Sequence, residues 1–248
     1  MKTLIAIIPA RYASKRFMGK PLANIRGKTM IQRVYEQVKK AVDIVVIATD
    51  DKRIFKKVTS FNGMVIMTSN AHTNGTERCY EALQIMEEKT HQKFDYVINV
   101  QGDEPFIQPQ QIEKLINLIT RNKSFRIATL VKRIDNLKKL KDPDVVKVVK
   151  TNQGKALYFS RAVIPFNSQV EDESFIKTRN FYKHIGMYAF RTETLKEIVN
   201  LPKSYLEKVE SLEQLRWLEH DYPVYVEETD IDSFGIDTPN DLAAINSK

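Results

Sequence analysis

The sequence predicts a doubly wound α/β fold, because short apolar runs alternate with segments of helical periodicity and the first run leads into a polar loop. Residues 4–8 form a continuous apolar run that ends at Pro9, a pattern typical of a strand buried on both faces of a parallel sheet. Residues 30–40 then carry apolar side chains at helical spacing, and residues 44–48 form a second predicted buried strand. This order of strand, loop, helix and strand is typical of a parallel sheet covered by helices.

The same alternation continues to about residue 100 and then loosens. We expect, in order, a helix at 52–60, a strand at 64–67, a helix at 76–88 and a strand at 96–100. After these we expect a helix from Pro109 through Ile119, strands near 127–131, 145–149, 156–159 and 184–190, helices at 192–200 and 210–219, a strand at 224–227 and a last helix at 239–245. The segment 167–180 is polar and mixed in charge, which suggests an exposed loop or lid. The C-terminal third therefore has the character of an inserted subdomain.

Length and composition favour a globular, enzyme-sized protein. A chain of 248 residues with 42% hydrophobic residues can bury a full core. No apolar run is long enough to cross a bilayer and the N-terminus has no signal-peptide pattern, so we expect a cytoplasmic protein without membrane insertion. The single cysteine, Cys79, excludes an intrachain disulfide and a multi-cysteine zinc site, and four scattered histidines argue against a histidine-rich metal site. Oxygen-ligated metals such as Mg²⁺ remain open.

The positive charge of the chain is concentrated at its beginning. The formal net charge is +8, and no acidic residue precedes Glu36. Eight basic residues lie in that acid-free stretch: Lys2, Arg11, Lys15, Arg16, Lys20, Arg26, Lys28 and Arg33. They equal the whole net excess, so the rest of the chain is nearly balanced. This distribution favours a local anion site over a general affinity for nucleic acid.

The loop of residues 9–22 lies where an open α/β sheet presents its ligands, at the carboxyl end of a strand. Gly19 is its only glycine, so it is neither a dinucleotide-binding fingerprint nor a Walker A loop. Its cations, Arg11, Lys15, Arg16 and Lys20, could neutralise a triphosphate and stabilise a departing pyrophosphate. By itself the segment is also compatible with a solvated basic surface loop.

A carboxylate is expected at the same edge of the sheet. Asp103 and Glu104 directly follow the strand predicted at 96–100. Mg²⁺ binds through one or two carboxylates together with substrate phosphates, so Asp103 is a candidate ligand. The second candidate is Asp237, although a capping role at the start of the last helix, shared with Thr238, is equally compatible.

Two further sets of polar residues, one near the predicted helix at 76–88 and one in the C-terminal half, are candidates for substrate contacts. The segment 73–78 opens a helix, with Gly75 allowing a close backbone approach and Thr76 able to cap, so it could face a base or a ribose or be a plain helix start. In the C-terminal half, a sugar acid would need an arginine for its carboxylate and mixed donors for its hydroxyls. The candidates there, each of which could instead be an ordinary surface or core residue, are Arg161, His184, Glu213 and Gln214.

Taken together, these segments resemble the 3-deoxy-manno-octulosonate (Kdo) cytidylyltransferases, also called CMP-Kdo synthetases. The resemblance covers almost the whole chain and is carried, in order, by PARYASKRFMGKPL from Pro9, ATDD from Ala48, NGTER from Asn74, NVQGDEP from Asn99, ALYFSRAVIP from Ala156, KHIGMYAF from Lys183, LEKVESLEQLR from Leu206 and GIDTPNDL from Gly235. It implies an α/β nucleotidyltransferase fold of the Rossmann-like, nucleotide-diphospho-sugar transferase type, with a mixed, mainly parallel sheet and a smaller C-terminal subdomain. It also implies a homodimer that uses Mg²⁺, CTP and Kdo to make CMP-Kdo and pyrophosphate for lipopolysaccharide synthesis.

Carried over residue by residue, the resemblance implies a role for each candidate. The nucleotide would contact Ala10, Arg11, Lys20, Gly75, Thr76, Arg78, Gln101 and Asp103. The catalytic residues would be Lys20, Arg16, Asp103 and Asp237, the last two holding Mg²⁺, and Kdo would contact Arg161, His184, Glu213 and Gln214. Within a single domain over 1–248, residues 1–131 would mainly bind nucleotide, 145–234 would mainly bind sugar and dimerise, and 235–248 would return to the main sheet.

The chain departs from the family pattern mildly, at Asn74 and Glu77, where Ser and Asp are usual, and at Phe17-Met18, where Leu-Pro or Phe-Pro is common. The glycine-rich loop variant of the related CMP-sialic acid synthetases is not found. A related sugar acid such as 8-amino-Kdo remains an alternative substrate. A basic nucleic-acid-binding module is a distant alternative, because the acidic motifs at Asp103 and Asp237 would repel phosphate without a cation between them.

Overall fold

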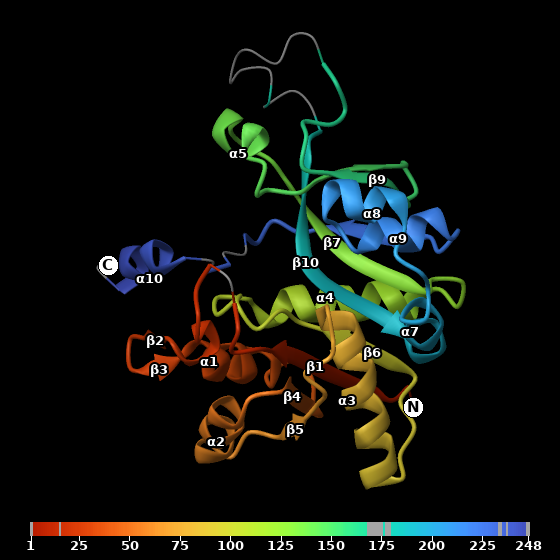
Figure 1. Cartoon of the computed structure of the whole chain (residues 1–248). Helices are drawn as coiled ribbons and strands as arrows, with labels where there is room; N and C mark the ends of the chain where they lie inside the picture. Colours follow the sequence, from red (N-terminus) through yellow and green to blue (C-terminus); the bar gives the residue numbers. More distant parts are fainter. Residues whose placement is uncertain are drawn as a thin grey trace. The chain divides into compact units, whose positions relative to one another are not determined.

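The computed structural model describes residues 2–14, 16–167, 176, 180–232, 235–236 and 238–246. The chain forms two compact units (Figure 1). Unit 1 comprises Met1–Glu113, Phe190–Val199 and Ser233–Lys248, and unit 2 comprises Lys114–Ala189 and Asn200–Asp232. Among the described residues, none of the helices has both the length and the apolar character needed to cross a bilayer.

Unit 1 is built on four parallel strands in the order β6 (Tyr96–Asn99), β1 (Leu4–Ala10), β4 (Val45–Thr49) and β5 (Val65–Met67). The central strand β1 follows from its sequence, because Ile5, Ala6, Ile7 and Ile8 are all fully buried. Such burial on both faces requires a continuous apolar run rather than an alternating one. The predicted α/β fold with mainly parallel strands is therefore confirmed.

The helices of unit 1 are α1 (Met30–Val38), α2 (Lys52–Ser60), α3 (Gly75–Thr90), α7 (Thr192–Ile198) and α10 (Pro239–Asn246), with a short 3₁₀ turn, η1 (Lys20–Leu22), and a small hairpin of β2 (Asn24–Ile25) and β3 (Lys28–Thr29). The start of α10 is a reciprocal cap. The amide of Asp241 donates to Thr238 Oγ1 (3.2 Å), and the amide of Thr238 donates to Asp241 Oδ2 (2.8 Å). Thr238 is thus the capping residue, and Asp241 completes the cap in the first turn.

Unit 2 contains β7 (Ile127–Arg133), β8 (Lys147–Lys150), β9 (Ala156–Ser160), most of β10 (Tyr182–Arg191) and β11 (Val224–Glu228). The order is β11, β7, β10, with β8 between β10 and β9; β11 pairs parallel to β7, whereas β8 is antiparallel to both neighbours. Its helices are α5 (Leu137–Lys141), α8 (Tyr205–Glu210) and α9 (Gln214–Glu219), and α4 (Pro109–Arg121) leads into the unit. The sheet of unit 2 is therefore mixed.

One predicted helix is wrong. Residues 210–219 do not form one helix, because Ser211 adopts a left-handed conformation (φ 55°) that ends α8 at Glu210, and α9 begins only at Gln214. The helices at 137–141 and 205–210 were not predicted, since each spans fewer than two turns and carries little periodicity. Most of the segment 167–180, predicted as a loop or lid, lies outside the described residues.

Candidate active site

Unit 1 contains a cavity of about 540 Å³, which we call the unit 1 cavity. Three segments line it: the basic loop after β1, the start of α3, and the turn after β6. Because β1 and β6 are parallel neighbours, their carboxyl ends deliver these loops to the same edge of the sheet. The predicted nucleotide and catalytic residues that line the cavity are Ala10, Arg11, Arg16, Lys20, Gly75, Arg78, Gln101 and Asp103. Thr76 is not a lining residue and is 3% exposed.

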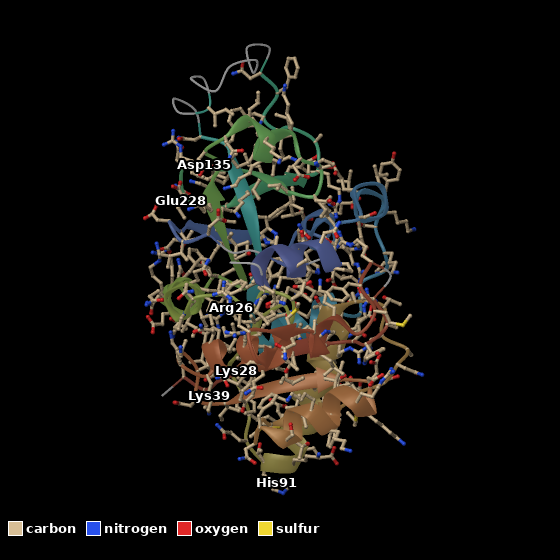
Figure 2. All side chains as sticks on the ribbon, turned by 90° about the vertical axis from the view of Figure 1, so that its left-hand side faces the viewer. Arg26, Lys28, Lys39, His91, Asp135 and Glu228 are labelled. Carbon is tan, nitrogen blue, oxygen red and sulfur yellow. The ribbon has the colours of Figure 1, made fainter. Side chains whose placement is uncertain are left out.

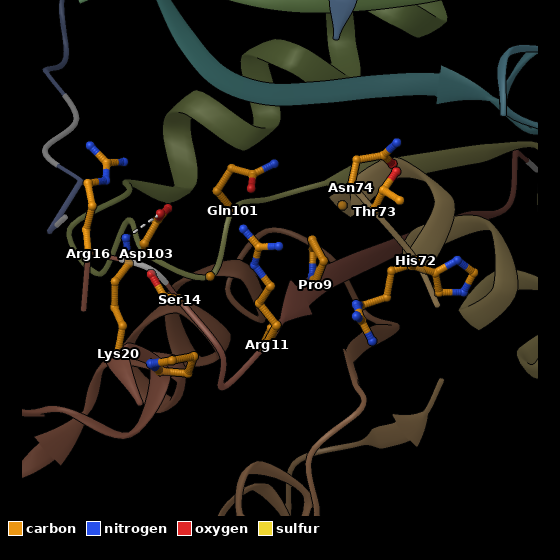
Figure 3. Close-up of a pocket in the computed structure, with 15 residues that line it drawn as sticks. Pro9, Arg11, Ser14, Arg16, Lys20, His72, Thr73, Asn74, Gln101 and Asp103 are labelled. Carbon is orange, nitrogen blue, oxygen red and sulfur yellow. Dashed lines mark hydrogen bonds and ion pairs between the residues drawn. The ribbon is translucent and has the colours of Figure 1, made fainter. Parts of the chain in front are cut away.

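Lys20 and Asp103 form the ionic centre of this cavity. Lys20 Nζ lies 2.7 Å from Asp103 Oδ2 (Figure 3), and the two side chains are 10% and 35% exposed, respectively. Within the described part of the chain, Oδ1 of Asp103 accepts no hydrogen bond and faces no cation. The structure thus juxtaposes a largely buried cation with a carboxylate that keeps one oxygen available.

The cavity is polarised along its length. Figure 3 shows Arg16, Lys20 and Asp103 toward one end and His72 and Asn74 toward the other. Lys15, the remaining cation of the loop, lies outside the described residues. Arg16, Lys20 and Asp103 therefore lie together toward one end of the cavity, and Arg11 lies between them and His72.

Two glycines let the lining segments approach β1 closely. A Cβ atom added to Gly102 would lie 3.0 Å from the carbonyl oxygen of Pro9, and one added to Gly75 would lie 3.2 Å from Pro9 Cγ. Both distances are tighter than ordinary van der Waals contacts. The Gly75 backbone therefore approaches β1 closely, which is a different contact from the approach to a base or a ribose expected from the sequence.

Arg78 lines the cavity but is engaged elsewhere. Its side chain is almost fully buried, Nη2 donates to Asp50 Oδ2 (2.7 Å), and Nη1 donates to Thr68 Oγ1 (2.6 Å). These partners follow β4 and β5, so Arg78 ties the start of α3 to the ends of two neighbouring strands. Its observed contacts are those of a residue that shapes the wall of the cavity.

The basic loop also contacts Arg53 of α2, an interaction that was not predicted from the sequence. The guanidinium of Arg53 stacks 3.3 Å from the centroid of the Tyr12 ring, and Asp51 holds that guanidinium through Nε (3.0 Å) and Nη2 (2.6 Å). The amide of Gly19 donates to the Tyr12 carbonyl (2.9 Å). Gly19 has φ +73°, and an added Cβ would lie 3.0 Å from the Tyr12 hydroxyl. Glycine is therefore required here both for conformation and for space.

Other basic residues of the acid-free stretch have local partners. Lys28 pairs with Glu36 (2.7 Å), Arg33 Nε donates to the Ile25 carbonyl (2.7 Å), and Arg26 Nη2 donates to the Ile245 carbonyl (3.2 Å). Figure 2 shows Arg26 and Lys28, which lie at the hairpin of β2 and β3. The stretch thus divides into cations that line the cavity and cations that stabilise the fold.

The second predicted metal ligand, Asp237, lies outside the described residues. Its neighbour Ile236 is fully buried, packs with Ile25 and Met30, and donates its amide to the carbonyl oxygen of Asp103 (3.0 Å). Ile236 is therefore tied directly to the backbone of Asp103.

Ser14, His72 and Asn74 are among the lining residues that were not predicted individually as site residues. His72 Nε2 lies 2.5 Å from Glu81 Oε2, and Asn74 caps α3 by accepting the Glu77 amide (2.8 Å). All three flank residues that were predicted. The order of the motifs could have identified their neighbourhood, but not their individual contacts.

In unit 2, the predicted residue His184 is enclosed by aromatic rings. Its ring lies edge-on to Phe159 (5.4 Å) and 5.1 Å from Tyr188. Burial lowers the pKa of His184 to about 3, so the imidazole is neutral at neutral pH. Thr129 Oγ1 donates to the Met187 carbonyl (2.7 Å), and His184 Nε2 lies 2.9 Å from Thr129 Oγ1. We therefore assign the proton to Nε2, which leaves Nδ1 as an acceptor.

Glu213 and Gln214 lie at the start of α9, close to the same aromatic cluster. Burial and the nearby Glu213 carboxylate both raise the pKa of Tyr188, whose ring meets Trp217 edge-on (4.9 Å). Gln214 is 6% exposed. His184 thus lies beside Tyr188, a residue whose pKa also responds to the Glu213 carboxylate.

The predicted residue Arg161 follows β9 and is rigidly held. Its Nε donates to the carbonyl oxygen of Glu210 (3.0 Å), and Nη1 donates to that of Pro143 (2.9 Å). The side chain is 38% exposed. The guanidinium is therefore anchored at two nitrogens and open to solvent at its end.

A family model described as Cytidylyltransferase matches residues 5–231. The 3-deoxy-manno-octulosonate cytidylyltransferase of Parabacteroides distasonis is 50% identical over 246 residues, covering 98% of this chain and 96% of the relative. That of Bacteroides thetaiotaomicron is 51% identical over 241 residues, covering 96% and 94%. A solved CMP:2-keto-3-deoxy-manno-octonic acid synthetase complexed with CTP is 37% identical, with a TM-score of 0.89 and coverage of 99% and 98%. The chain belongs to the family of the 3-deoxy-manno-octulosonate cytidylyltransferases.

Proposed function

We propose that this protein transfers CMP from CTP to the anomeric hydroxyl of Kdo, releasing pyrophosphate, as a step in lipopolysaccharide synthesis. The observation that carries the proposal is the near full-length match to 3-deoxy-manno-octulosonate cytidylyltransferases, combined with a cavity in which Lys20 and Asp103 form an ion pair. The family motifs at 9–22, 74–78 and 99–105 all contribute lining residues to that cavity.

The charged end of the unit 1 cavity suits the triphosphate of CTP. Arg11, Arg16 and Lys20 line one cavity, and cationic donors of this kind bind phosphate oxygens strongly. When the α-phosphorus is attacked, negative charge develops on the departing pyrophosphate. Donors that are already in place stabilise that charge without reorganising. Lys20 is the best placed of them, because its ion pair and its burial fix its position. The nucleoside would occupy the other end, near Gly75 and Gln101.

The residues of this cavity fit a bound Mg²⁺ ion, which we propose as the cofactor. Mg²⁺ is usually held by one or two carboxylates plus substrate phosphates. Asp103 offers one oxygen without a described partner, and the backbone bond from Ile236 ties the sequence neighbour of Asp237 to Asp103. Asp103 and Asp237 would therefore hold the ion. When bound, the ion would neutralise phosphate charge and lower the pKa of a coordinated hydroxyl.

The sugar acid is assigned to residues of unit 2. Arg161 offers a carboxylate its nitrogen Nη2, which has no partner among the described residues, on a side chain that is 38% exposed. His184 offers an acceptor at Nδ1 for a hydroxyl group, and its low pKa keeps that atom unprotonated. Glu213 and Gln214 add an acceptor carboxylate and a mixed amide.

The reaction itself is a displacement that depends on positioning. The anomeric oxygen forms a bond to the α-phosphorus of CTP, the bond from that phosphorus to the β-phosphate oxygen breaks, and the hydroxyl proton leaves to solvent. Correct alignment of the two substrates supplies much of the rate enhancement in such reactions. Charge stabilisation by Lys20 and its neighbours supplies the rest, so no side-chain base is needed. Because CTP is a cytoplasmic metabolite, we place the reaction in the cytoplasm.

A pyrophosphate-release assay tests the proposal. Four nucleoside triphosphates are each combined with Kdo, 8-amino-Kdo and sialic acid in the presence of Mg²⁺. We expect rapid release only with CTP and Kdo. A preference for 8-amino-Kdo would reassign the sugar, and no release with CTP and any acid would contradict the proposal. Light scattering of the same preparation tests the homodimer that we propose from the family.

A further inference from the structure

Lys147 is a fully buried lysine that bonds to backbone rather than to a carboxylate. Lys147 is the first residue of β8. Its Nζ donates to the carbonyl oxygens of Asp142 (2.8 Å) and Arg161 (2.5 Å). A buried ammonium is costly unless its donors are satisfied, and a similarly long apolar side chain would avoid that cost. The position of this charge therefore calls for an explanation beyond packing.

Glu210, the last residue of α8, contacts the amide and the side chain of Arg161, whereas Lys147 contacts its carbonyl oxygen. Its Oε1 accepts from the Ser160 hydroxyl (2.6 Å), its Oε2 accepts from the Arg161 amide (2.9 Å), and its carbonyl oxygen accepts from Arg161 Nε (3.0 Å). The end of β9 is thus fixed to the end of α8. The left-handed Ser211, which ends α8 at Glu210, makes this carbonyl available.

These contacts leave one part of Arg161 free. Its amide, its carbonyl oxygen, Nε and Nη1 all have partners, whereas Nη2 has none among the described residues. An arginine side chain normally samples many rotamers, and ordering it on binding reduces affinity. Here the ordering has already taken place. The free nitrogen is presented in a fixed direction on a partly exposed side chain.

We propose that Lys147 and Glu210 are positioning residues that hold Arg161 ready for the carboxylate of the sugar acid. This inference rests on the proposed function, because it takes the carboxylate-binding role of Arg161 from it. Lys147 fixes the carbonyl side of Arg161 and adds a positive charge behind it. Glu210 fixes the amide side and the guanidinium. Neither residue contacts the substrate in this scheme, so both act through Arg161 alone.

The test compares Glu210→Gln and Lys147→Met with Lys208→Met, which removes an exposed cation of α8 that has no described partner. Glu210→Gln keeps the size of the side chain and the backbone carbonyl, but removes the charge and replaces one of the two oxygens that accept from the Ser160 hydroxyl and the Arg161 amide. We expect the KM for Kdo to rise by about tenfold or more in both test variants, the scale of a lost hydrogen bond to a charged group. The Kd for CTP, measured by calorimetry without Kdo, should stay at the wild-type value, and Lys208→Met should match the wild type throughout.

A double-mutant cycle separates positioning from general damage. In an Arg161→Met background, the further change Glu210→Gln should not raise the KM for Kdo again, because the residue through which it acts is gone. An equal rise in both backgrounds, or a fall in kcat and melting temperature with an unchanged KM, would overturn the inference. If Lys147→Met does not fold, the isosteric Glu210→Gln cycle decides alone. Failure of the wild type to release pyrophosphate would instead overturn the proposed function.

Discussion

The unit 1 cavity and the surroundings of Arg161 in unit 2 present cations in different ways. In the cavity, Arg11, Arg16 and Lys20 come from one loop after β1, and Lys20 pairs with the carboxylate of Asp103. Arg161 is instead held by groups from the β7–β8 connection, β8 and α8, far apart in the sequence. The first arrangement can be recognised in a sequence because its members are neighbours. The second exists only after the chain has folded.

The largest expected effect is at the carboxylate of the cavity. Asp103→Ala should abolish turnover, lowering kcat by a factor of about 10³ or more, because it removes the proposed metal ligand and the carboxylate that pairs with Lys20. Stability should change little, since the side chain is 35% exposed. Pyrophosphate release and thermal unfolding together check this. Release at the wild-type rate would remove Asp103 from the proposed metal site.

Lys20→Ala should have the next largest effect. If Lys20 stabilises charge on the leaving pyrophosphate, kcat/KM for CTP should fall by about 10² to 10³. The matched control is Lys28→Ala, which removes a cation of the same acid-free stretch that is paired with Glu36 on the surface. The control should keep wild-type kinetics. Equal values of kcat/KM for CTP in the two variants would mean that Lys20 does not stabilise the leaving pyrophosphate.

Acid sensitivity probes the buried His184 of unit 2. Its folded pKa of about 3 lies below the unfolded value of about 6.5, so the unfolded state binds more protons between these values. The free energy of unfolding should therefore fall as the pH drops through that window, by up to about 1.4 kcal/mol per pH unit from this group. Denaturant unfolding at several pH values should give a shallower slope for His184→Gln. Identical slopes would show that His184 takes up its proton over the same pH range in the folded and unfolded states.

The same contrast explains what the sequence could predict. Strands β1, β4 and β6 were predictable because each is a buried apolar run, and the residues at their carboxyl ends had to meet at one edge. The pairing of Lys20 with Asp103 follows from that topology. The contacts of Lys147 and Glu210 do not, because both residues have ordinary neighbours in the sequence and form their bonds with distant backbone atoms. The break at Ser211 was missed for a related reason, since the left-handed conformation of a serine leaves no pattern.

The smallest expected effect is at Arg53, a residue of α2 that stacks on Tyr12 of the basic loop. This prediction tests whether CTP binding depends on a residue outside that loop. The stacking of Arg53 on Tyr12 is at the surface, where such contacts contribute about 0.5–1 kcal/mol. Arg53→Lys keeps the charge but loses the planar group that stacks, so the KM for CTP should rise by about two- to fivefold, the same free energy expressed as affinity. The KM for Kdo should not change.

Two variants make this last prediction specific. Tyr12→Phe keeps the ring and should behave like the wild type, whereas Lys56→Ala removes an exposed cation of the same helix that has no described partner. A rise in the KM for CTP in Lys56→Ala equal to that in Arg53→Lys would mean that α2 acts through its total charge. A rise confined to Arg53→Lys would mean that the planar stack holds the loop. The cavity of unit 1 would then share with Arg161 the use of a distant residue to fix a cationic segment, differing mainly in how deeply that residue is buried.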